Sequence, residues 1–200
     1  TTDTMVRGQD WRDDWSGPED VAAKVLIANL ADVAAMGAVP TSILCTLVLD
    51  PQTPVDWVLR FARGLGEQCR RYAVSVAGGD LSSAPAGVAM VTIAAFGELP
   101  GDPVLRSGAR PGHVLAVTGP LGRSGVGLAL LEGASAGGPV GGELPAAGVA
   151  HHLRPSSPLG QGPIAAAAGA SAMLDVSDGL SRDAARLARA SGVVVRIDGS

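Results

Sequence analysis

Apolar residues in the first hundred positions recur with two different periods, which predict helices alternating with strands. Between residues 18 and 36 they return every three or four positions, as in an amphipathic helix. Ser16 and Glu19 have the spacing of a capping box at the start of this stretch, and Gly37 follows it as a stop signal. A second helix is expected over residues 55–72, and strands are expected over residues 1–7, 42–49, 74–77 and 88–96.

The second half of the chain has a weaker pattern, in which alanine and glycine dominate. Residues 133–148 show little periodicity, and we expect a mobile loop there. Gly119 to Gly125 is predicted to form a glycine-rich turn. Strands are expected over residues 114–118, 173–175 and 193–197, and helices over residues 126–131 and 179–190.

The order of these elements predicts an α/β (α+β) protein, because strands and helices alternate along the chain. A polar join that contains proline and glycine, residues 100–111, is the expected boundary between a domain of residues 1–105 and one of residues 106–200. The chain has no initiator methionine and begins directly on a strand-like segment. We therefore expect both domains to be incomplete, the first lacking its first strand.

Composition limits the possible partners and locations. Apolar residues make up 46% of the chain, which suffices for a buried core. The formal net charge is −4 and the arginines are scattered, so nucleic acid is not expected as a partner. The longest apolar runs are well short of the roughly 20 residues that span a membrane. Cys45 and Cys69 lack metal-binding spacing, so we expect buried, reduced thiols in a cytoplasmic protein.

Aspartates in four short patches are the main chemical signal. An unpaired carboxylate in an apolar scaffold is costly or becomes protonated, so several of them suggest shared cations. Hard oxygen ligands without clustered cysteine or histidine favour Mg²⁺, which in proteins usually bridges to phosphates. The patches are Thr1-Thr2-Asp3, Asn29-Leu30-Ala31-Asp32, Gly78-Gly79-Asp80 and Asp175-Val176-Ser177-Asp178.

Each patch also has a structural alternative. Ser177 or Asp178 could simply cap the following helix, although a cap leaves Asp175 unexplained. Two glycines before Asp80 are typical of a tight turn. Asp32 lies on the apolar stripe of its helix and could instead pair with a lysine or arginine, Lys24 being one candidate.

Other motifs favour structural roles. Gly119, Gly122 and Gly125 lack the Gly-Lys-Ser/Thr sequence of a phosphate loop, so we interpret them as strand-to-helix packing. The pair His151 and His152 is expected to be solvated. No cysteine or histidine accompanies the aspartate patches, so a nucleophile–base pair is not predicted. This pattern suits phosphoryl transfer, which needs positioning and charge rather than a covalent intermediate.

Taken in order, these motifs resemble those of the thiamine-monophosphate kinases, a family of the aminoimidazole ribonucleotide synthetase superfamily. The resemblance spans the whole chain, and its most distinctive part is the helix motif from Asn29 to Ala38. The other motifs that carry it are Thr1-Thr2-Asp3, Trp15 to Val21, Gly78-Gly79-Asp80, Leu105 to Gly112 and Asp175 to Leu180.

The resemblance implies a two-domain architecture in which an N-terminal mixed sheet has helices on one face and pairs with a second chain into a barrel. The start of a C-terminal α/β domain would follow. It implies direct, Mg²⁺-assisted transfer of the γ-phosphoryl group of ATP to thiamine monophosphate, by a homodimer without a covalent nucleophile. The implied Mg²⁺ ligands are Thr1, Thr2, Asp3, Asp32, Asp80, Asp175 and Asp178, and the implied ATP contacts are Gly79, Asp80, Arg106 and Ser177.

The chain departs from the family pattern in three respects. The family's upstream Gly-Asp-Asp motif and its C-terminal substrate residues are not part of this sequence. Asp10 and Trp11 stand where the family has a substrate-contacting histidine and a phenylalanine. We expect Asp10 to face a cation or the positive thiazolium ring, the alternative being an exposed turn residue. Two further functions stay open, namely another ATP-dependent synthetase of the superfamily and a non-catalytic nucleotide-binding paralogue.

Overall fold

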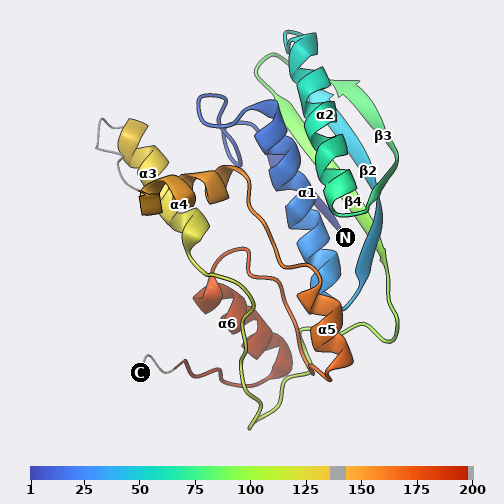
Figure 1. The fold of residues 1–200 in the computed structure, drawn as a ribbon, viewed down its shortest axis with the longest axis vertical. Helices are drawn as coiled ribbons and strands as arrows, with labels where there is room; N and C mark the ends of the chain where they lie inside the picture. Colours follow the sequence, from blue (N-terminus) through green and yellow to red (C-terminus); the bar gives the residue numbers. More distant parts are fainter. Residues whose placement is uncertain (136–142, 198–200) are drawn as a thin grey trace. The chain divides into compact units, whose positions relative to one another are not determined.

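The computed structural model describes residues 1–135 and 143–197, where strands and helices alternate in the first half and helices follow one another in the second (Figure 1). The strands are β1 (Thr2–Val6), β2 (Val39–Leu49), β3 (Ser75–Ser83) and β4 (Ala89–Glu98). The helices are α1 (Pro18–Ala35), α2 (Val55–Arg71), α3 (Arg123–Ser135), α4 (Glu143–Leu153), α5 (Gln161–Ala167) and α6 (Leu180–Ser191).

Residue contacts divide the chain into two compact units. Unit 1 comprises Thr1–Asn29, Thr41–Phe96 and Gly122–Ser156. Unit 2 comprises Leu30–Pro40, Gly97–Leu121 and Ser157–Ser200. Helix α1 contributes its first two-thirds to unit 1 and its last turns to unit 2. The domains expected from the sequence, residues 1–105 and 106–200, stay a prediction.

The four strands form one mixed sheet in the order β1-β4-β2-β3. β1 pairs antiparallel with β4, whereas β2 and β3 run parallel and are joined by the crossover helix α2. The expected strands near residues 1–7, 42–49 and 88–96 are confirmed. β3 is longer than expected, since it continues through Gly78, Gly79 and Asp80 to Ser83. The interpretation of these residues as a tight turn is therefore wrong.

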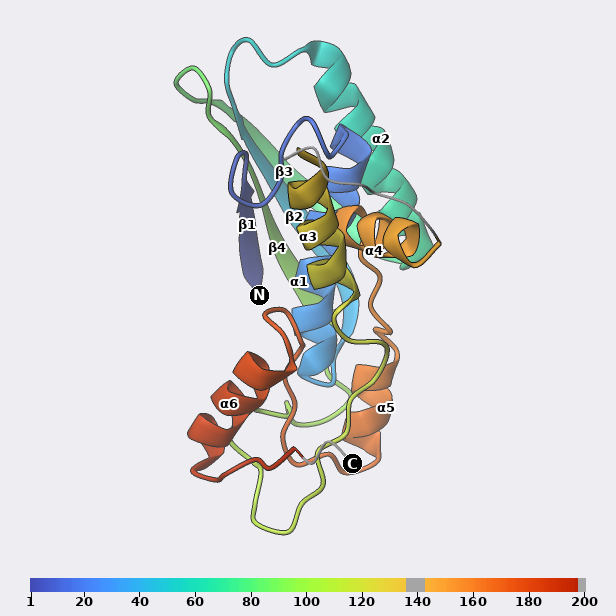
Figure 2. The same ribbon diagram turned by 90° about the vertical axis from the view of Figure 1, so that its left-hand side faces the viewer.

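Helices α1 and α2 cover one face of this sheet (Figures 1 and 2). The core between them contains fully buried Val25, Ile43, Val91 and Phe61. The two helices approach closely at Gly64, because a Cβ atom there would lie 2.9 Å from Cα of Glu19. Apolar burial of this kind, rather than helix propensity, holds such helices in place.

The start of α1 differs in detail from the predicted capping box. The main-chain N–H of Gly17 donates to Oδ2 of Asp20 (2.8 Å), and Asp20 N–H donates to the Gly17 carbonyl (3.0 Å). Glu19 instead accepts two hydrogen bonds from Arg60 of α2, at 2.7 and 2.8 Å. The capping carboxylate is thus one residue later than expected, because Glu19 links the two helices.

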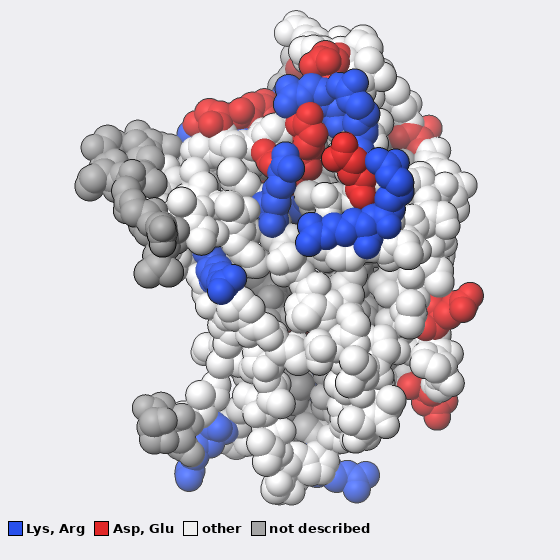
Figure 3. Space-filling view, in the orientation of Figure 1, with Lys and Arg blue, Asp and Glu red and all other residues white. Residues whose placement is uncertain are grey.

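Acidic and basic side chains are interspersed on the face shown in Figure 3.

Three strands expected in the second half are absent from the described residues. Residues 114–118, 173–175 and 193–197 belong to no strand or helix, and Val114 and Val194 are 91% and 94% exposed. Strands need partners for their N–H and C=O groups, which a single-segment pattern does not reveal. The glycines at 119 and 122 have positive φ (79° and 80°), so they serve turns rather than strand-to-helix packing.

The mobile loop expected over residues 133–148 is wrong in its described parts, since α3 extends to Ser135 and α4 begins at Glu143. Residues 136–142 lie outside the described residues. The two helices pack closely where Gly127 meets Gly148: a Cβ atom on Gly127 would lie 2.2 Å from the Gly148 carbonyl oxygen. The small residues that weaken the hydrophobic periodicity of this region therefore allow the two helices to pack closely.

Candidate active site

Three of the predicted site residues lie in unit 2, where the charges of two of them act on the third. Asp32 lies in the last turns of α1, and Asp175 lies in the segment before α6. Arg106 directly follows Leu105, which is hydrogen-bonded to that segment. The Met173 N–H donates to the Leu105 carbonyl (3.3 Å), which holds the two loop segments side by side. Partial burial raises the pKa of the Asp175 carboxyl to about 6.

Neighbouring charges add to this effect on the Asp175 pKa. The carboxylates of Asp32 and Asp183 raise it, and the guanidinium of Arg106 lowers it without cancelling the rise. Two carboxylates that face each other in a half-buried place are costly to ionise together. A divalent cation between oxygen ligands removes this cost, so the arrangement fits the predicted role of Asp32 and Asp175.

The loop from Asp175 to Gly179 is held from α6. Oδ2 of Asp183 accepts the main-chain N–H of Asp178 (2.9 Å), and Arg186 forms an ion pair with the Asp178 carboxylate. Gly179 occupies the N-cap position with a φ of 102° and no side-chain cap. The alternative in which Ser177 or Asp178 caps the helix is therefore wrong, and both side chains are exposed.

Main-chain atoms fix the position of Arg106 as well. The hydroxyl of Ser191, at the end of α6, donates to the Arg106 carbonyl (2.8 Å) and accepts the Ala109 N–H (3.1 Å). Ser191 thereby ties the 106–109 loop to the helix that carries Asp183. Arg106 is exposed, so its guanidinium can reach an anion while it faces Asp175.

The remaining predicted metal ligands lie on the sheet. Thr1 and Thr2 donate hydrogen bonds to main-chain carbonyl groups of β4. The amine of Thr1 donates to the Ala95 carbonyl (3.0 Å), and the Thr2 hydroxyl donates to the Ile93 carbonyl (3.0 Å). Asp3 is exposed and accepts the N–H of Thr4 (2.8 Å).

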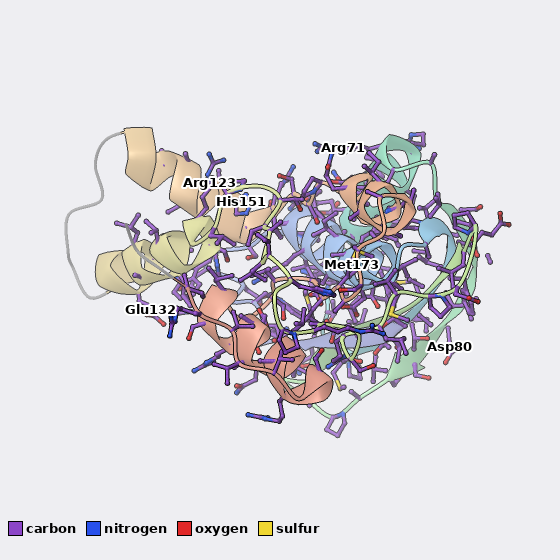
Figure 4. The ribbon with its side chains drawn as sticks, turned by 90° about the horizontal axis from the view of Figure 1, so that it is seen from below. Arg71, Asp80, Arg123, Glu132, His151 and Met173 are labelled. Atoms are coloured by element: carbon purple, nitrogen blue, oxygen red, sulfur yellow. The ribbon has the colours of Figure 1, made fainter. Side chains whose placement is uncertain are left out.

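Asp80 is exposed on β3, at the outer edge of the sheet (Figure 4), and accepts the Ser82 hydroxyl at 3.1 Å. β1 and β3 are the two edge strands, and two strands separate them. At the usual spacing of neighbouring strands, the edges are about 14 Å apart. Asp3 and Asp80 of one sheet are therefore not brought together. Among the described residues, no group of three acidic, histidine or cysteine side chains is close enough to hold a metal ion.

Gly79 has a structural reason to be glycine. It pairs with Cys45 of β2 next to a bulge, and a Cβ atom at this position would lie 1.8 Å from the Cys45 carbonyl oxygen. The close approach of β2 and β3 thus requires a residue without a side chain. Both cysteines are free thiols, as expected; Cys69 is buried, whereas Cys45 is only half-buried, and burial raises the pKa of Cys45 to about 11.

Asp10 lies in a tight turn after β1. Its Oδ2 accepts the main-chain N–H of Val6 (2.7 Å), and its carbonyl accepts a hydrogen bond from Nζ of Lys24 (2.8 Å). Trp11 is 3% exposed and packs in the interior, where its indole N–H donates to Asp13 (3.2 Å). The carboxylate of Asp10 is exposed and accepts this turn-forming hydrogen bond.

Lys24 and His152 were not singled out as site residues by the sequence. Burial lowers the pKa of Lys24, and burial together with the charge of Lys24 lowers the pKa of His152. His152 is half-buried and bonded to the Ser124 hydroxyl (2.9 Å). His151 lies on the same hairpin as Arg123 (Figure 4), which lowers its pKa in addition to burial. The expected solvated histidine pair is therefore wrong, because α4 packs both side chains.

Asp183 and Arg186 were missed as well. Their signal in the sequence is a plain acidic and a plain basic residue three positions apart, which is common on exposed helix faces. The structure shows instead that Asp183 is 3% exposed and bonded to the Asp178 loop.

Comparison with known proteins identifies the class. Residues 1–99 match the family described as AIR synthase related protein, N-terminal domain. Residues 110–200 match the AIR synthase related protein, C-terminal domain. The two matches together cover nearly the whole chain, which therefore belongs to the AIR synthase related family.

Within this family, the similar curated relatives are thiamine-monophosphate kinases, as the motifs indicated. The chain is 44% identical to the Mycobacterium tuberculosis enzyme over 199 residues, which are 99% of the chain and 56% of the relative. It is 36% identical to the Escherichia coli K12 enzyme over 206 residues, covering 99% of the chain and 59% of the relative. The chain thus spans less than two-thirds of the length of these relatives.

Solved structures confirm the fold. The thiamine monophosphate kinase of Aquifex aeolicus matches with a TM-score of 0.85 and 33% identity, over 96% of this chain and 63% of that chain. A structure of AaThiL complexed with AMPPCP and TMP matches with a TM-score of 0.87 and 33% identity, over 96% and 60%. The described helices contain none that is long and apolar enough to cross a bilayer.

Proposed function

We propose that the whole protein carrying this chain transfers the γ-phosphoryl group of ATP to thiamine monophosphate, giving thiamine diphosphate and ADP. Similarity to thiamine-monophosphate kinases over 99% of the chain supports this reaction, as does the AMPPCP and TMP complex of a similar protein. The structural observation that carries it is the raised pKa of Asp175 opposite Asp32, with Arg106 beside them. We infer a cation site here, next to a side chain that can bind an anion.

The chemistry requires two polyanions to meet. A phosphate oxygen of thiamine monophosphate forms a bond to the γ-phosphorus of ATP, and the bond to the oxygen that bridges the β- and γ-phosphorus breaks. The electron pair of that bond leaves on ADP, and no covalent enzyme intermediate is needed. The protein's task is to neutralise charge and to align the attacking and leaving oxygens.

The proposed Mg²⁺ ligands come from both units, and the described geometry supports those of unit 2 most directly. When bound, Mg²⁺ would supply Lewis-acid neutralisation of the phosphates. Arg106 can grip a phosphate through two N–H groups. We assign Mg²⁺ binding to Thr1, Thr2, Asp3, Asp32, Asp80, Asp175 and Asp178, and contacts with ATP to Gly79, Asp80, Arg106 and Ser177.

A coupled assay of ADP release by the full-length protein tests this proposal. We expect ADP formation that depends on both Mg²⁺ and thiamine monophosphate. A related ATP-dependent synthetase would release ADP only with a different acceptor, and a nucleotide-binding paralogue would release none. ADP formation that is indifferent to thiamine monophosphate contradicts the proposed reaction.

We also propose that the protein is a cytoplasmic homodimer built through its sheet. Side chains on the strands leave apolar surface exposed within the described chain, with Leu44 39%, Val76 50% and Phe96 50% exposed. Pairing the sheets of two chains would cover this surface and remove open strand edges. Sedimentation of the full-length protein at micromolar concentration should give twice the chain mass. A strictly monomeric mass contradicts the dimer.

A further inference from the structure

Three side chains at the start of α6 form a bridge of two carboxylates and one guanidinium. Nη1 of Arg186 lies 2.6 Å from Oδ1 of Asp183, and Nη2 of Arg186 pairs with Oδ2 of Asp178. The second oxygen of Asp183 accepts the main-chain N–H of Asp178 at 2.9 Å. Asp178 is thus held through its main chain and its side chain from the same helix.

Burial indicates which member of the bridge is the anchor. Asp183 is 3% exposed, whereas the side chains of Asp178 and Arg186 are 39% and 44% exposed. A buried carboxylate is stable only when its oxygens are paired. Both oxygens of Asp183 have partners, one in Arg186 and one in the Asp178 N–H. Asp183 therefore acts through the loop and not as a ligand itself.

The loop depends on this bridge because the helix start offers little else to hold it. Gly179 has a φ of 102°, a conformation that favours glycine, and no side chain caps the helix from the N-cap position. The segment before it, residues 173–177, is in no strand or helix. The orientation of the Asp178 carboxylate is therefore set by Asp183 and Arg186.

We propose that Asp183 and Arg186 are positioning residues for cation binding by Asp178; the inference rests on the proposed function of this site. Arg186 is bonded to Oδ2 of Asp178, so Oδ1 is the oxygen that we assign to the cation. Carboxylates that bind metals are commonly oriented by outer hydrogen-bonding partners, whose loss weakens binding by about 10- to 100-fold.

Two substitutions each disrupt the bridge while the Asp178 carboxylate itself is kept. Asp183→Asn keeps an oxygen for the Asp178 N–H but removes one of the two carboxylates that hold Arg186, which then pairs with Asp178 alone. Arg186→Lys keeps the positive charge but offers one nitrogen, which cannot bond both carboxylates as the guanidinium fork does. Arg182→Lys is the matched control, because Arg182 is an exposed arginine on the same helix.

The experiment measures Mn²⁺ binding to the full-length protein, with Mn²⁺ as a paramagnetic probe for the Mg²⁺ sites and the free ion counted by electron paramagnetic resonance. We expect Asp183→Asn and Arg186→Lys each to weaken one Mn²⁺ site by about tenfold or more. Arg182→Lys should bind as the wild type does. The double variant should be no weaker than the weaker single variant, because the two residues form one bridge.

A merely structural role gives a different result. Loss of helix capping alone lowers the urea midpoint and leaves the Mn²⁺ dissociation constant unchanged. Binding by both single variants within twofold of the wild type overturns the inference, as does a double variant whose loss is the product of the single losses. If the wild type itself binds no Mn²⁺ or forms no ADP, the proposed function fails instead, so the two failures are distinguishable.

Discussion

The carboxylates proposed as metal ligands have different surroundings in the two units. In unit 1, Asp3 and Asp80 are exposed on edge strands, each with a local hydrogen bond from a neighbouring residue. In unit 2, Asp32 and Asp175 are both half-buried, and the pKa of Asp175 rises to about 6 because of its burial first and the charge of Asp32 second. Burial therefore opposes the ionised form of Asp175 when no cation is bound.

This difference shows that carboxylates proposed as ligands of the same kind of ion can differ in how deeply the fold buries them. An exposed carboxylate binds a cation without having been destabilised beforehand. A crowded, half-buried carboxylate is destabilised until a cation arrives, so its unit gains stability on binding. Activity alone cannot tell the two sets apart, whereas stability in the absence of metal can.

The largest expected effect is on catalysis. Asp32→Asn, Asp80→Asn and Asp175→Asn in the full-length protein should each lower kcat/KM by about a thousandfold, which corresponds to about 4 kcal/mol of lost charge neutralisation. Circular dichroism should show that the fold survives, since an amide keeps the shape of the side chain. Full activity in any two of the three variants would remove the assignment of these residues to the metal cluster.

The next effect distinguishes the units by stability. In metal chelator at pH 7, Asp175→Asn should raise the free energy of unfolding by roughly 1–2 kcal/mol, because the substitution removes an ionisation that burial opposes. Asp80→Asn, at an exposed position, should change it by less than about 0.5 kcal/mol. Urea titrations of both variants check this contrast. Equal shifts would mean that the two units hold their carboxylates alike.

The same contrast has a pH signature. The pKa of Asp175 is higher in the folded chain than its usual value of 3.8, so the folded state binds the proton more tightly than the unfolded state does. Metal-free stability should therefore fall as pH rises from about 4 to about 6, and Asp175 should contribute no further loss above that range. Asp175→Asn should remove this part of the decline. An unchanged profile in the variant contradicts the raised pKa.

The smallest effect concerns Asp10. Asp10→Asn keeps an acceptor for the Val6 N–H but removes the charge proposed to face the thiazolium ring. We expect the KM for thiamine monophosphate to rise about threefold with kcat unchanged, as for a partly exposed charge pair. A change below about twofold, worth roughly 0.4 kcal/mol, would leave Asp10 as a turn residue only. Asp14→Asn, at another exposed aspartate nearby, serves as the control.

The elements of the sheet and its two helices could be predicted because each carries its own signal. Burial of Val25 and Phe61 follows from periodicity, and the end of α1 follows from Gly37, whose φ of 85° favours glycine. The expected strands of the second half failed because an extended apolar segment becomes a strand only with a partner. α4 and α5 were not predicted, because their alanine- and glycine-rich sequences give no clear apolar face.

The sequence predicted the proposed ligands of the candidate site but not the residues that hold those ligands in position. Aspartates in apolar surroundings are visible in a sequence, and three predicted residues do meet in unit 2. Asp183 and Arg186 look like an ordinary exposed pair until the fold buries the first of them. Lys24 likewise looked like a partner for Asp32, whereas its ammonium group donates to the carbonyl of Asp10. Long-range contacts of this kind have no local signal.

The close approach at Gly79 has a consequence for experiments on nucleotide binding. Any side chain at this position would push the Cys45 carbonyl away and separate two parallel strands, so a loss of activity in a Gly79 variant would report the broken sheet as readily as a lost ATP contact. Substitution of Gly79 therefore cannot separate a structural role from a role in ATP binding. Its main-chain N–H is the informative probe, because slower amide exchange at Gly79 on addition of a nucleotide would register the contact without altering an atom of the protein.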